Sequence, residues 1–421
     1  MSSEYSTENS DNIETSSLSS DDVQDHQDNL MLQGDIIKNY NVICEIGRGT
    51  YSIIWLAYNI VTNKFHALKV QNPEEYKDAV LEIEVVKKLP SNPKLFNNII
   101  EHFTEVINQK KYLCSAWELH CTDLDSVVRN GILSEGLSII QVKSVMKQLL
   151  EAIFIMHKKL KLFHGDIKPD NILIKGISKR NEFIIKEYIK EDFFGRYNLA
   201  KKDFLIKKGQ SLKQLDTMNK EDKKIIRRGI HNQITNNVLN KLEVVNISKY
   251  DIDECYLKDI KISLADFGMC CEEHNFFEEP FGTRYYQAPE IILMGKCSYP
   301  VDIWAIGCTF YELLAQNFLF NPIKDSQHTR DYYHLCLIND TCGKFDKDFL
   351  KRTKYYKTYF DNGRLKDYIS NDNDRLNRKI MDLNFDNDIK KIVKTILTKT
   401  LLIEPSNRIK ITDLIKEPFF N

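Results

Sequence analysis

Three side chains in the stretch HGDIKPDN, residues 164–171, are spaced for the transfer of a phosphoryl group. Asp166 can accept the proton of a substrate hydroxyl or orient that hydroxyl for attack. Lys168 can neutralise charge on the transferred group, and Asn171 can hold a metal ion. Pro169 keeps the loop from becoming a helix. A single aspartate before a helix is often only a cap, but the whole octapeptide is too specific for that reading, and we predict a catalytic loop.

A second carboxylate and an ion pair complete the expected chemistry. Asp266 in LADFG can bind Mg²⁺ that bridges the terminal phosphates of a nucleotide. Lys69 in HALKV ends a predicted strand, and Glu82 follows it on a predicted helix. A lysine at the end of a strand is usually only solvated. Together with the glycines described next, however, the order of these residues predicts a Lys69–Glu82 pair at a nucleotide site.

A pair of glycines precedes these residues, in EIGRGTYSIIW at 45–55. Gly47 and Gly49 let the backbone between two strands close over phosphates, because only glycine tolerates the turn and the close approach. Ser52 stands where a third glycine is usual. Glycine pairs are common in plain hairpins. This pair therefore indicates a nucleotide site only in combination with the lysine and the aspartates that follow.

The segments around these motifs predict two unequal lobes with a cleft between them. Alternating apolar residues from about 35 to 70 indicate strands, and residues 75–89 switch to a helical period with charges on the outer face. Further strands are predicted near 98–107 and 111–118, and the chain becomes helical from about residue 138. A strand-rich part followed by a helix-rich part predicts an α+β, bilobal fold.

Residues 178–257 interrupt this order. They separate ILI from ISLADFG, two short apolar strands that would otherwise form a hairpin, and the segment is too long for an ordinary connection. We interpret it as an insertion with some local helix. Its basic stretch KKIIRR at 223–228 is compatible with a nucleic-acid contact, a nuclear-import signal or a solvated linker; we expect a linker and no direct binding of nucleic acid.

Composition bounds the remaining classes. Residues 1–33 hold eight Asp or Glu and no Lys or Arg, and we expect a disordered, acidic, serine-rich tail there. The sequence has no run of 18 apolar residues and no basic-then-apolar signal pattern, which argues against a membrane span and against secretion. The ten cysteines are scattered without zinc-type spacing, which favours reduced thiols inside a cell. The expected parts are the tail, an N-lobe, the first part of a C-lobe, the insertion and the second part of the C-lobe, at residues 1–33, 34–118, 119–177, 178–257 and 258–421.

Together these motifs resemble the eukaryotic protein kinases over roughly residues 34–178 and 258–421. Within them the chain is most similar to the SR-protein kinases of the CMGC group, which phosphorylate serine in Arg/Ser-rich splicing factors. RGTYSIIWLAYN and NGILSEGLSIIQVKSVMKQLL have that family's patterns, HGDIKPDN resembles its His-Thr-Asp form of the loop, and the family splits its kinase core where the insertion lies. The resemblance implies an ATP- and Mg²⁺-dependent serine/threonine kinase that acts as a monomer, in the cytoplasm and nucleus, on such splicing factors.

The resemblance also assigns residues to the site. The expected catalytic residues are Asp166, Lys168, Lys69 and Glu82, and the expected metal ligands are Asn171 and Asp266. The residues expected around ATP are Ile46, Gly47, Gly49, Ser52, Ile54, Ala67, Lys69, Trp117, Glu118, Leu119 and Leu173. The acids expected to dock an Arg-rich substrate are Asp123, Asp125, Asp170 and Asp340.

Gly165 distinguishes this loop from that of most protein kinases, which carry an arginine there to bind a phosphate on the activation loop. Residues 269–282 contain no Ser, Thr or Tyr that could be phosphorylated. The two absences agree, and we predict an activation loop held by packing and a constitutively competent enzyme. Glu290 is expected to pair with Arg408 and to tie the next segment to the helical lobe, as a structural rather than a catalytic pair.

Three residues depart from the SR-protein kinase pattern. Asn317 and Tyr333 stand where acids of a docking groove are expected. Gln287 replaces an arginine that is usual in the wider group, which leaves open the residue preferred after the phosphorylated position.

Three other functions are compatible with parts of the sequence. A LAMMER-type dual-specificity kinase also acts on SR proteins, but its namesake motif is expected near 330–343, where this chain reads RDYYHLCLINDTCG. A small-molecule kinase often carries a His-Gly-Asp loop, yet Lys168 and the segment through APE speak against it. A catalytically dead scaffold has no support, because every residue needed for phosphoryl transfer is present.

Overall fold

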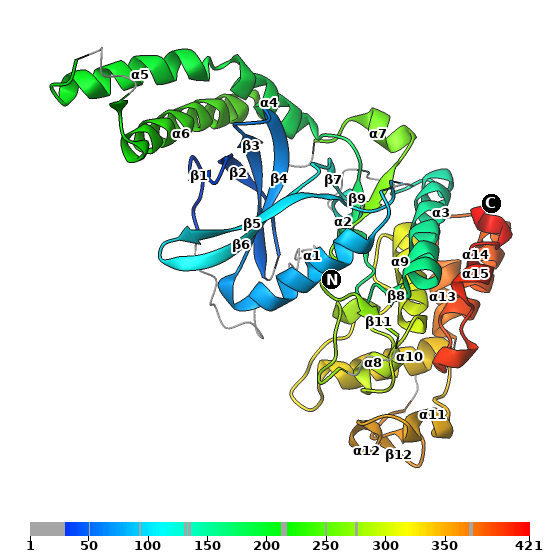
Figure 1. The fold of residues 1–421 in the computed structure, drawn as a ribbon. Helices are drawn as coiled ribbons and strands as arrows, with labels where there is room; N and C mark the ends of the chain where they lie inside the picture. The colour runs from blue at the N-terminus through cyan, green and yellow to red at the C-terminus, as the bar shows by residue number, and fades with distance from the viewer. Residues whose placement is uncertain are drawn as a thin grey trace, which may run out of the picture.

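The computed structural model describes residues 30–49, 51–91, 94–129, 133, 136–211, 217–248, 251–273, 277–369 and 374–421. The described chain forms two lobes, one built on a sheet and the other on helices (Figure 1). The expected α+β, bilobal fold is therefore confirmed.

The N-lobe is a six-stranded antiparallel sheet in the order β1-β2-β3-β4-β6-β5. Its strands are β1 Ile36–Ile37, β2 Tyr40–Arg48, β3 Ser52–Asn59, β4 Lys64–Gln71, β5 Ile99–Ile107 and β6 Lys110–Trp117. Helix α1, Tyr76–Lys88, lies on the sheet and buries Ala79 and Ile83 against Leu113 of β6. The predicted helix at 75–89 and the predicted strands at 98–107 and 111–118 are confirmed as α1, β5 and β6.

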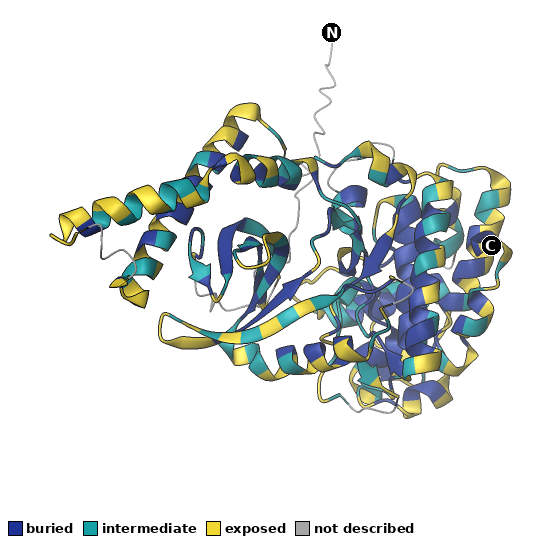
Figure 2. Ribbon diagram, turned by 45° about the horizontal axis from the view of Figure 1, so that its top comes forward, coloured by how far each residue is buried: buried dark blue, intermediate teal, exposed yellow. Residues whose placement is uncertain are grey.

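The C-lobe is helical. Its helices are α2 Leu124–Arg129, α3 Ile139–Ile155, α8 Pro289–Ile292, α9 Pro300–Ala315, α10 Arg330–Cys342, α11 Lys347–Lys351, α12 Tyr356–Tyr359, α13 Arg375–Met381, α14 Asn387–Thr400 and α15 Ile411–Leu414. Helix α3 begins at Ser138, whose side chain forms a reciprocal capping box with Gln141. Helix α9 is buried from Val301 to Leu314, so it is the centre of this lobe's core, which Figure 2 shows in dark blue.

Short strands place the loops that carry the chemistry. They are β7 Thr122–Asp123, β8 Leu162–Phe163, β9 Ile172–Ile174, β10 Ile262–Leu264, β11 Cys271–Glu272, β12 Phe360–Asp361 and β13 Arg364–Leu365. Strand β9 pairs with β10 and with β7, and β8 pairs with β11. The residues before β9 and after β10 therefore meet at one edge of a small sheet.

The insertion is looped out of the β9–β10 hairpin. Ile174 is opposite Ile262 in the antiparallel register, and the Lys175 N–H donates to the Lys261 carbonyl at 2.8 Å, which closes the neck. Between the two strands lie α4 Lys179–Lys190, α5 Phe193–Lys207, α6 Lys220–Val245 and α7 Glu254–Lys258. The free ends of α5 and α6 project away from the C-lobe (Figure 1).

Helices α4 and α6 pack on the N-lobe sheet instead of forming a solvated linker. Apolar side chains of β2 and β3 share one buried cluster with both helices; the cluster includes Ile43, Cys44, Leu56, Ile184, Tyr188, Ile226, Ile230 and Ile234. The Asn41 amide donates to the Tyr188 hydroxyl at 3.0 Å within this contact. The linker expected at 223–228 is wrong, because those residues belong to α6 and one face of that helix is buried.

The tail boundary expected at residue 33 is also wrong. Residues 1–29 lie outside the described residues. Leu30 and Leu32 are buried, with exposed fractions of 6% and 1%, in a cluster with Tyr40 and Trp55 of the sheet. The apolar sequence LML gave enough hydrophobic surface to anchor these residues. Among the helices of the described chain, none is both long and apolar enough to cross a membrane.

Candidate active site

The catalytic loop is held by a buried carboxylate of α9. Asp302 is 1% exposed and accepts hydrogen bonds from the backbone N–H groups of His164 and Gly165, at 2.8 and 2.9 Å. The imidazole of His157 lies 2.7 Å from the same carboxylate. The loop is thus fixed to the centre of the C-lobe just before Asp166.

Asp166 lies among three hydrogen-bond donors. Its carboxylate accepts from the Thr283 N–H at 2.7 Å and from the Asn171 amide at 3.1 Å, and the Lys168 ammonium lies 3.2 Å away. Burial alone would raise the pKa of Asp166, but Lys168 and the Thr283 N–H outweigh burial, and the pKa lies below its ordinary value. The carboxylate is therefore ionised at neutral pH and able to accept a hydrogen bond from a hydroxyl group.

Glycine at 165 is required by the backbone. Gly165 has φ +83°, and a Cβ there would lie 2.8 Å from the Met269 carbonyl oxygen. Gly282 faces it with φ +73°, and a Cβ there would lie 2.7 Å from the Gly165 carbonyl oxygen. The two glycines let the activation segment approach the catalytic loop closely enough for Thr283 to bond Asp166.

Asn171 and Asp266 leave the two strands of the β9–β10 hairpin at the same end. The Ala265 N–H donates to the Asn171 carbonyl at 2.9 Å, which joins the two segments. Asp266 has φ +60°, a conformation that is costly for a non-glycine residue and is found at functional sites. A carboxylate and an amide oxygen are hard donors of the kind that Mg²⁺ prefers, so this pair fits the metal expected there.

Lys69 and Glu82 form a buried ion pair in the N-lobe. The Lys69 ammonium lies 3.0 and 2.8 Å from the two Glu82 oxygens. Burial would lower the pKa of Lys69, but Glu82 and then Asp266 outweigh it, and the pKa is raised. Asp266 of the C-lobe therefore lies near enough for its charge to act on this N-lobe ammonium.

The residues expected around ATP lie on five strands, in the β2–β3 turn and in the segment after β6. Gly47 is opposite Ile54 in the β2–β3 register, Ile54 is opposite Lys69, and Ala67 is opposite Trp117. Of the others, Ile46, Gly49 and Ser52 lie in or beside the β2–β3 turn, Glu118 and Leu119 follow β6, and Leu173 lies in β9. The N-lobe sheet, the segment after β6 and strand β9 thus carry the residues expected around ATP, whose binding role stays a prediction.

The reason given for the two glycines of this turn is wrong in part. Neither Gly47 nor Gly49 has a left-handed φ, and a Cβ on either would meet only ordinary contacts, at 3.6 Å or more. The turn itself therefore accepts other residues. The other part of that reason, close approach of a phosphate, stays a prediction.

Glu290 and Arg408 form a bidentate pair at 2.5 and 2.7 Å, with side chains only 1% and 0% exposed. Arg408 also donates to the Pro300 carbonyl at 2.9 Å and to the Leu402 carbonyl at 2.7 Å. The pair joins α8 to the C-terminal helices, far from the reacting groups.

The described part of the activation segment is anchored by aromatic packing. Phe277 stacks on Phe281 with ring centroids 3.8 Å apart, and both rings contact Phe163 of β8. Cys271 pairs with Phe163 across β11 and β8. Gln287 donates from its amide to the carbonyls of Phe281 and Gly282, at 3.1 and 3.3 Å. These contacts are packing of the kind expected to hold the segment, and independence from a phosphate stays a prediction.

The four acids expected to dock substrate do not lie together. Asp125 and Asp170 both lie beside Arg129, whereas Asp123 caps α2 by accepting from Ser126. Asp340 lies on α10 and accepts from Tyr368. Asp125 and Asp170 therefore form an acidic site at Arg129, and the charge of Asp123 also acts on Asp125.

Glu312 belongs to this acidic site, although the motifs gave no reason to select it. Its carboxylate lies 3.6 Å from Arg129 and accepts from the Tyr286 hydroxyl at 2.5 Å. Burial raises the pKa of Glu312 to about 7, although Tyr286 and Arg129 act against the rise. Burial and the neighbouring Asp170 raise the pKa of Asp125 to about 6. A lone acid within the apolar run WAIGCTFYELLA was the signal that could have identified Glu312.

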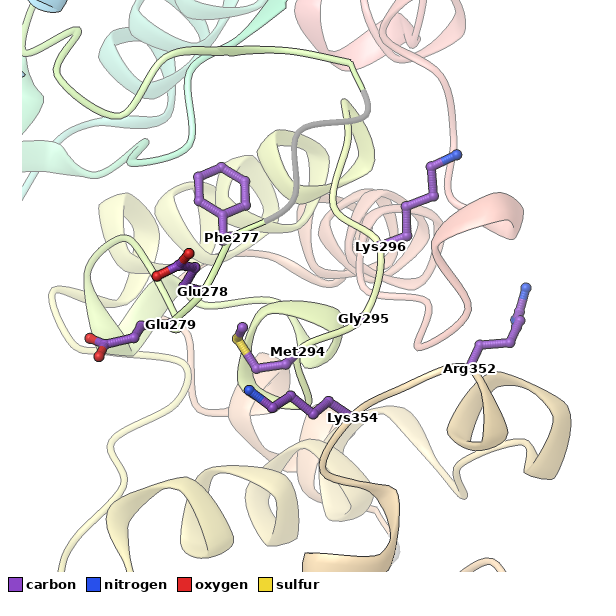
Figure 3. A pocket seen from close by; sticks show the side chains of 8 residues that line it. All are labelled: Phe277, Glu278, Glu279, Met294, Gly295, Lys296, Arg352 and Lys354. Carbon is purple, nitrogen blue, oxygen red and sulfur yellow. The ribbon is translucent and has the colours of Figure 1, made fainter.

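A cavity of about 610 Å³ lies beside the activation segment and is lined by none of the residues expected to be catalytic or to bind metal or ATP. Its lining residues are Phe277, Glu278, Glu279, Met294, Gly295, Lys296, Arg352 and Lys354. Figure 3 shows the two carboxylates pointing away from Lys296 and Arg352. The side chain of Lys354, by contrast, points toward the side of the cavity on which Met294 and Glu279 lie.

Comparison with known proteins agrees with this geometry. The model of the protein kinase domain family matches residues 40–190 and 252–420, and it omits most of the insertion. The chain therefore belongs to the protein kinase domain family, and it is an enzyme of that class.

Among individual relatives, it is 26% identical to the protein named serine/threonine-protein kinase L205 of Acanthamoeba polyphaga mimivirus, over 97% of this chain and 92% of that one. It is 24% identical to the serine/threonine-protein kinase SRPK of Physarum polycephalum, over 79% and 74%. It is 23% identical to the dual specificity protein kinase lkh1 of Schizosaccharomyces pombe, over 90% of this chain and 46% of that protein.

Proposed function

We propose that this protein kinase transfers the γ-phosphoryl group of ATP to serine in Arg/Ser-rich proteins, with Mg²⁺ as the metal. The observation that carries the transfer is the convergence of Asp166, Lys168 and Asn171 with Asp266 and Lys69 between the two lobes. Two carboxylates, an amide and two ammonium groups at one place suit the triphosphate end of a nucleotide.

Each group has a distinct task in this proposal. Asp166 orients the hydroxyl and accepts its hydrogen bond, and Lys168 is placed beside it by the Thr283 hydroxyl at 2.6 Å. Lys69, fixed by Glu82, aligns the phosphates. Bound Mg²⁺ supplies charge neutralisation on the phosphates, and Asn171 with Asp266 would hold it.

The acidic site around Arg129 supports the choice of an Arg-rich substrate. Asp125, Asp170 and Glu312 bring three carboxylates to one arginine of the chain itself. Asp170 precedes the metal ligand Asn171 directly, so this surplus of negative charge lies next to the catalytic loop. A guanidinium group of a peptide can form the planar, bidentate contacts that such carboxylates accept. The similarity to the Physarum kinase named SRPK supports the same substrate class.

The assay uses the purified chain with ATP and an Arg-Ser repeat peptide, with acidic and proline-directed peptides as controls. We expect phosphate only on the Arg-Ser peptide, and transfer by Asp166→Asn that is at least about 10²-fold slower. Equal labelling of all three peptides would contradict the substrate class. No labelling of any protein or peptide would contradict a catalytic role and favour a scaffold.

Variants of the acidic site test its part in recognition. Asp125→Asn and Asp170→Asn should raise the KM for the Arg-Ser peptide by at least about tenfold each, since a charge-assisted hydrogen bond contributes roughly 1.5–3 kcal/mol. The matched control is Asp388→Asn, an acid of α14 whose side chain is 87% exposed. If all three variants have the same KM for the Arg-Ser peptide, the acidic site does not bind the arginine of the substrate.

A dual-specificity kinase is the second candidate, favoured by the similarity to the dual specificity kinase of Schizosaccharomyces pombe. The same peptide with tyrosine in place of serine separates the two. Phosphotyrosine formed at a rate close to that of phosphoserine would establish the alternative.

A further inference from the structure

Helix α6 carries a stripe of exposed basic side chains on the face opposite its buried one. Lys220, Lys224 and Arg228 follow each other at intervals of four residues, so they share one face of the helix. Ile226 and Ile230 lie on the other face and are buried against the N-lobe cluster. We call Lys220, Lys224 and Arg228 the cationic stripe.

The surroundings of the cationic stripe are also basic. The described residues of 191–228 hold ten Lys or Arg and five Asp or Glu. Within the described chain, five of these lysines form no ion pair; they are Lys201, Lys202, Lys207, Lys220 and Lys224. A partner for this hairpin should therefore be acidic.

The N-terminal segment already uses the same face of α6. Gln33 donates to Asn236 at 3.1 Å, Gly34 lies against Asn232, and the Asp35 carboxylate lies 2.8 Å from Arg228. These α6 residues continue the cationic stripe at the same four-residue interval. One acid from the N-terminal segment is thus paired with the stripe, and Lys224 and Lys220 lie next along it.

The chain upstream of this contact has the complementary charge. Residues 1–29 hold eight Asp or Glu and no Lys or Arg. Asn236 and Lys220 are about 24 Å apart along the helix, at 1.5 Å per residue. Because an extended chain spans about 3.3 Å per residue, 29 residues are long enough to reach the whole stripe from Leu30.

We propose that the acidic segment 1–29 docks on the cationic stripe of its own chain. The Asp35–Arg228 pair is then the ordered end of a longer electrostatic contact. The docked segment covers the basic face of the insertion and adds to the contact between the insertion and the N-lobe. This proposal does not depend on the substrate of the kinase.

Zero-length carbodiimide cross-linking of the intact chain tests the contact directly. We expect amide bonds between carboxylates of 1–29 and Lys220 or Lys224, identified by mass spectrometry at low salt. They should disappear at 1 M salt, where the Debye length falls to about 3 Å. Mixing isotopically light and heavy protein should give only light–light and heavy–heavy products. Mixed products, cross-links to other lysines, or none from 1–29 would overturn the proposal.

Charge variants give a second readout. The double variant Lys220→Glu/Lys224→Glu should lose these cross-links, whereas Lys394→Glu on an exposed position of α14 should keep them. A single-stranded RNA probe distinguishes the other polyanion that this stripe could hold. A full-length variant with its eight tail acids neutralised should bind the probe at least about tenfold more tightly than the natural chain, because a competing polyanion is removed. Equal binding by both would mark the stripe as a nucleic-acid surface and overturn the proposal.

Discussion

Restoring the usual arginine at Gly165 should damage this kinase. In most protein kinases an arginine at this position binds an activation-loop phosphate. Here the position has φ +83°, and a Cβ would lie 2.8 Å from a backbone oxygen of Met269. Because that oxygen belongs to the backbone, it can move only if the activation segment moves. We therefore expect Gly165→Arg to displace Thr283 from Asp166.

The free-energy penalty of Gly165→Arg has two contributions, one from the backbone conformation and one from overpacking. A non-glycine residue in the left-handed region costs about 1–2 kcal/mol. Overpacking in a close-packed region costs about 1–3 kcal/mol more. A penalty of roughly 2–5 kcal/mol on the closed segment corresponds to a loss of about 30-fold to several thousand-fold in the competent population, at 1.36 kcal/mol per factor of ten.

The assay compares kcat and KM for peptide and ATP in Gly165→Arg, Gly165→Ala and the natural chain. Both variants should lose kcat, while the KM for ATP stays unchanged, because the expected adenine contacts lie elsewhere. Gly209→Ala is the matched control, since Gly209 also has a positive φ, +68°, but has nothing within 4 Å of a Cβ. Natural kcat and thermal stability in Gly165→Arg would refute the reasoning.

Three further outcomes follow from the buried charges. Asp166→Asn should reduce kcat by at least about 10²-fold, as loss of a general base or hydroxyl-orienting group does, and leave ATP affinity unchanged in a calorimetric titration. Glu290→Gln leaves Arg408 buried without its anion, and should cost about 3–5 kcal/mol in the free energy of unfolding measured with urea. Glu312 has a pKa raised from 4.5 to about 7 on folding, so the stabilisation present below pH 4.5 is lost as pH rises through 7. Glu312→Gln should therefore flatten the fall in melting temperature between pH 5 and pH 8; an unchanged slope would show that another group titrates.

Most of the candidate site residues could be selected from the order and spacing of polar motifs in the sequence. Asp166, Asn171 and Asp266 could be selected from their motifs, and the pairing of β9 with β10 places Asn171, just before β9, near Asp266, just after β10. The many charged residues of the insertion between those strands obscured the fact that it packs on the N-lobe. Its apolar residues Ile226, Ile230, Ile234, Val238 and Leu242 do recur every four positions, which signals a helix with a buried face.

The partner of that face could not be read from sequence. Ile43 and Leu56 lie more than a hundred residues upstream, and local periodicity contains no information about such distant contacts. The requirement for glycine at position 165 could likewise not be predicted from the sequence. The sequence showed a missing arginine, whereas the physical requirement is a backbone angle and an approach to Met269 that only the folded chain reveals.

The two ends of the insertion leave the catalytic domain side by side, at Lys175 and Lys261. A tight turn could replace everything between them without disturbing the hairpin. Ile43 and Leu56 would then be exposed to water, because α4 and α6 of the insertion cover them. Replacement of this insertion by a different one would therefore require matching changes at Ile43 and Leu56.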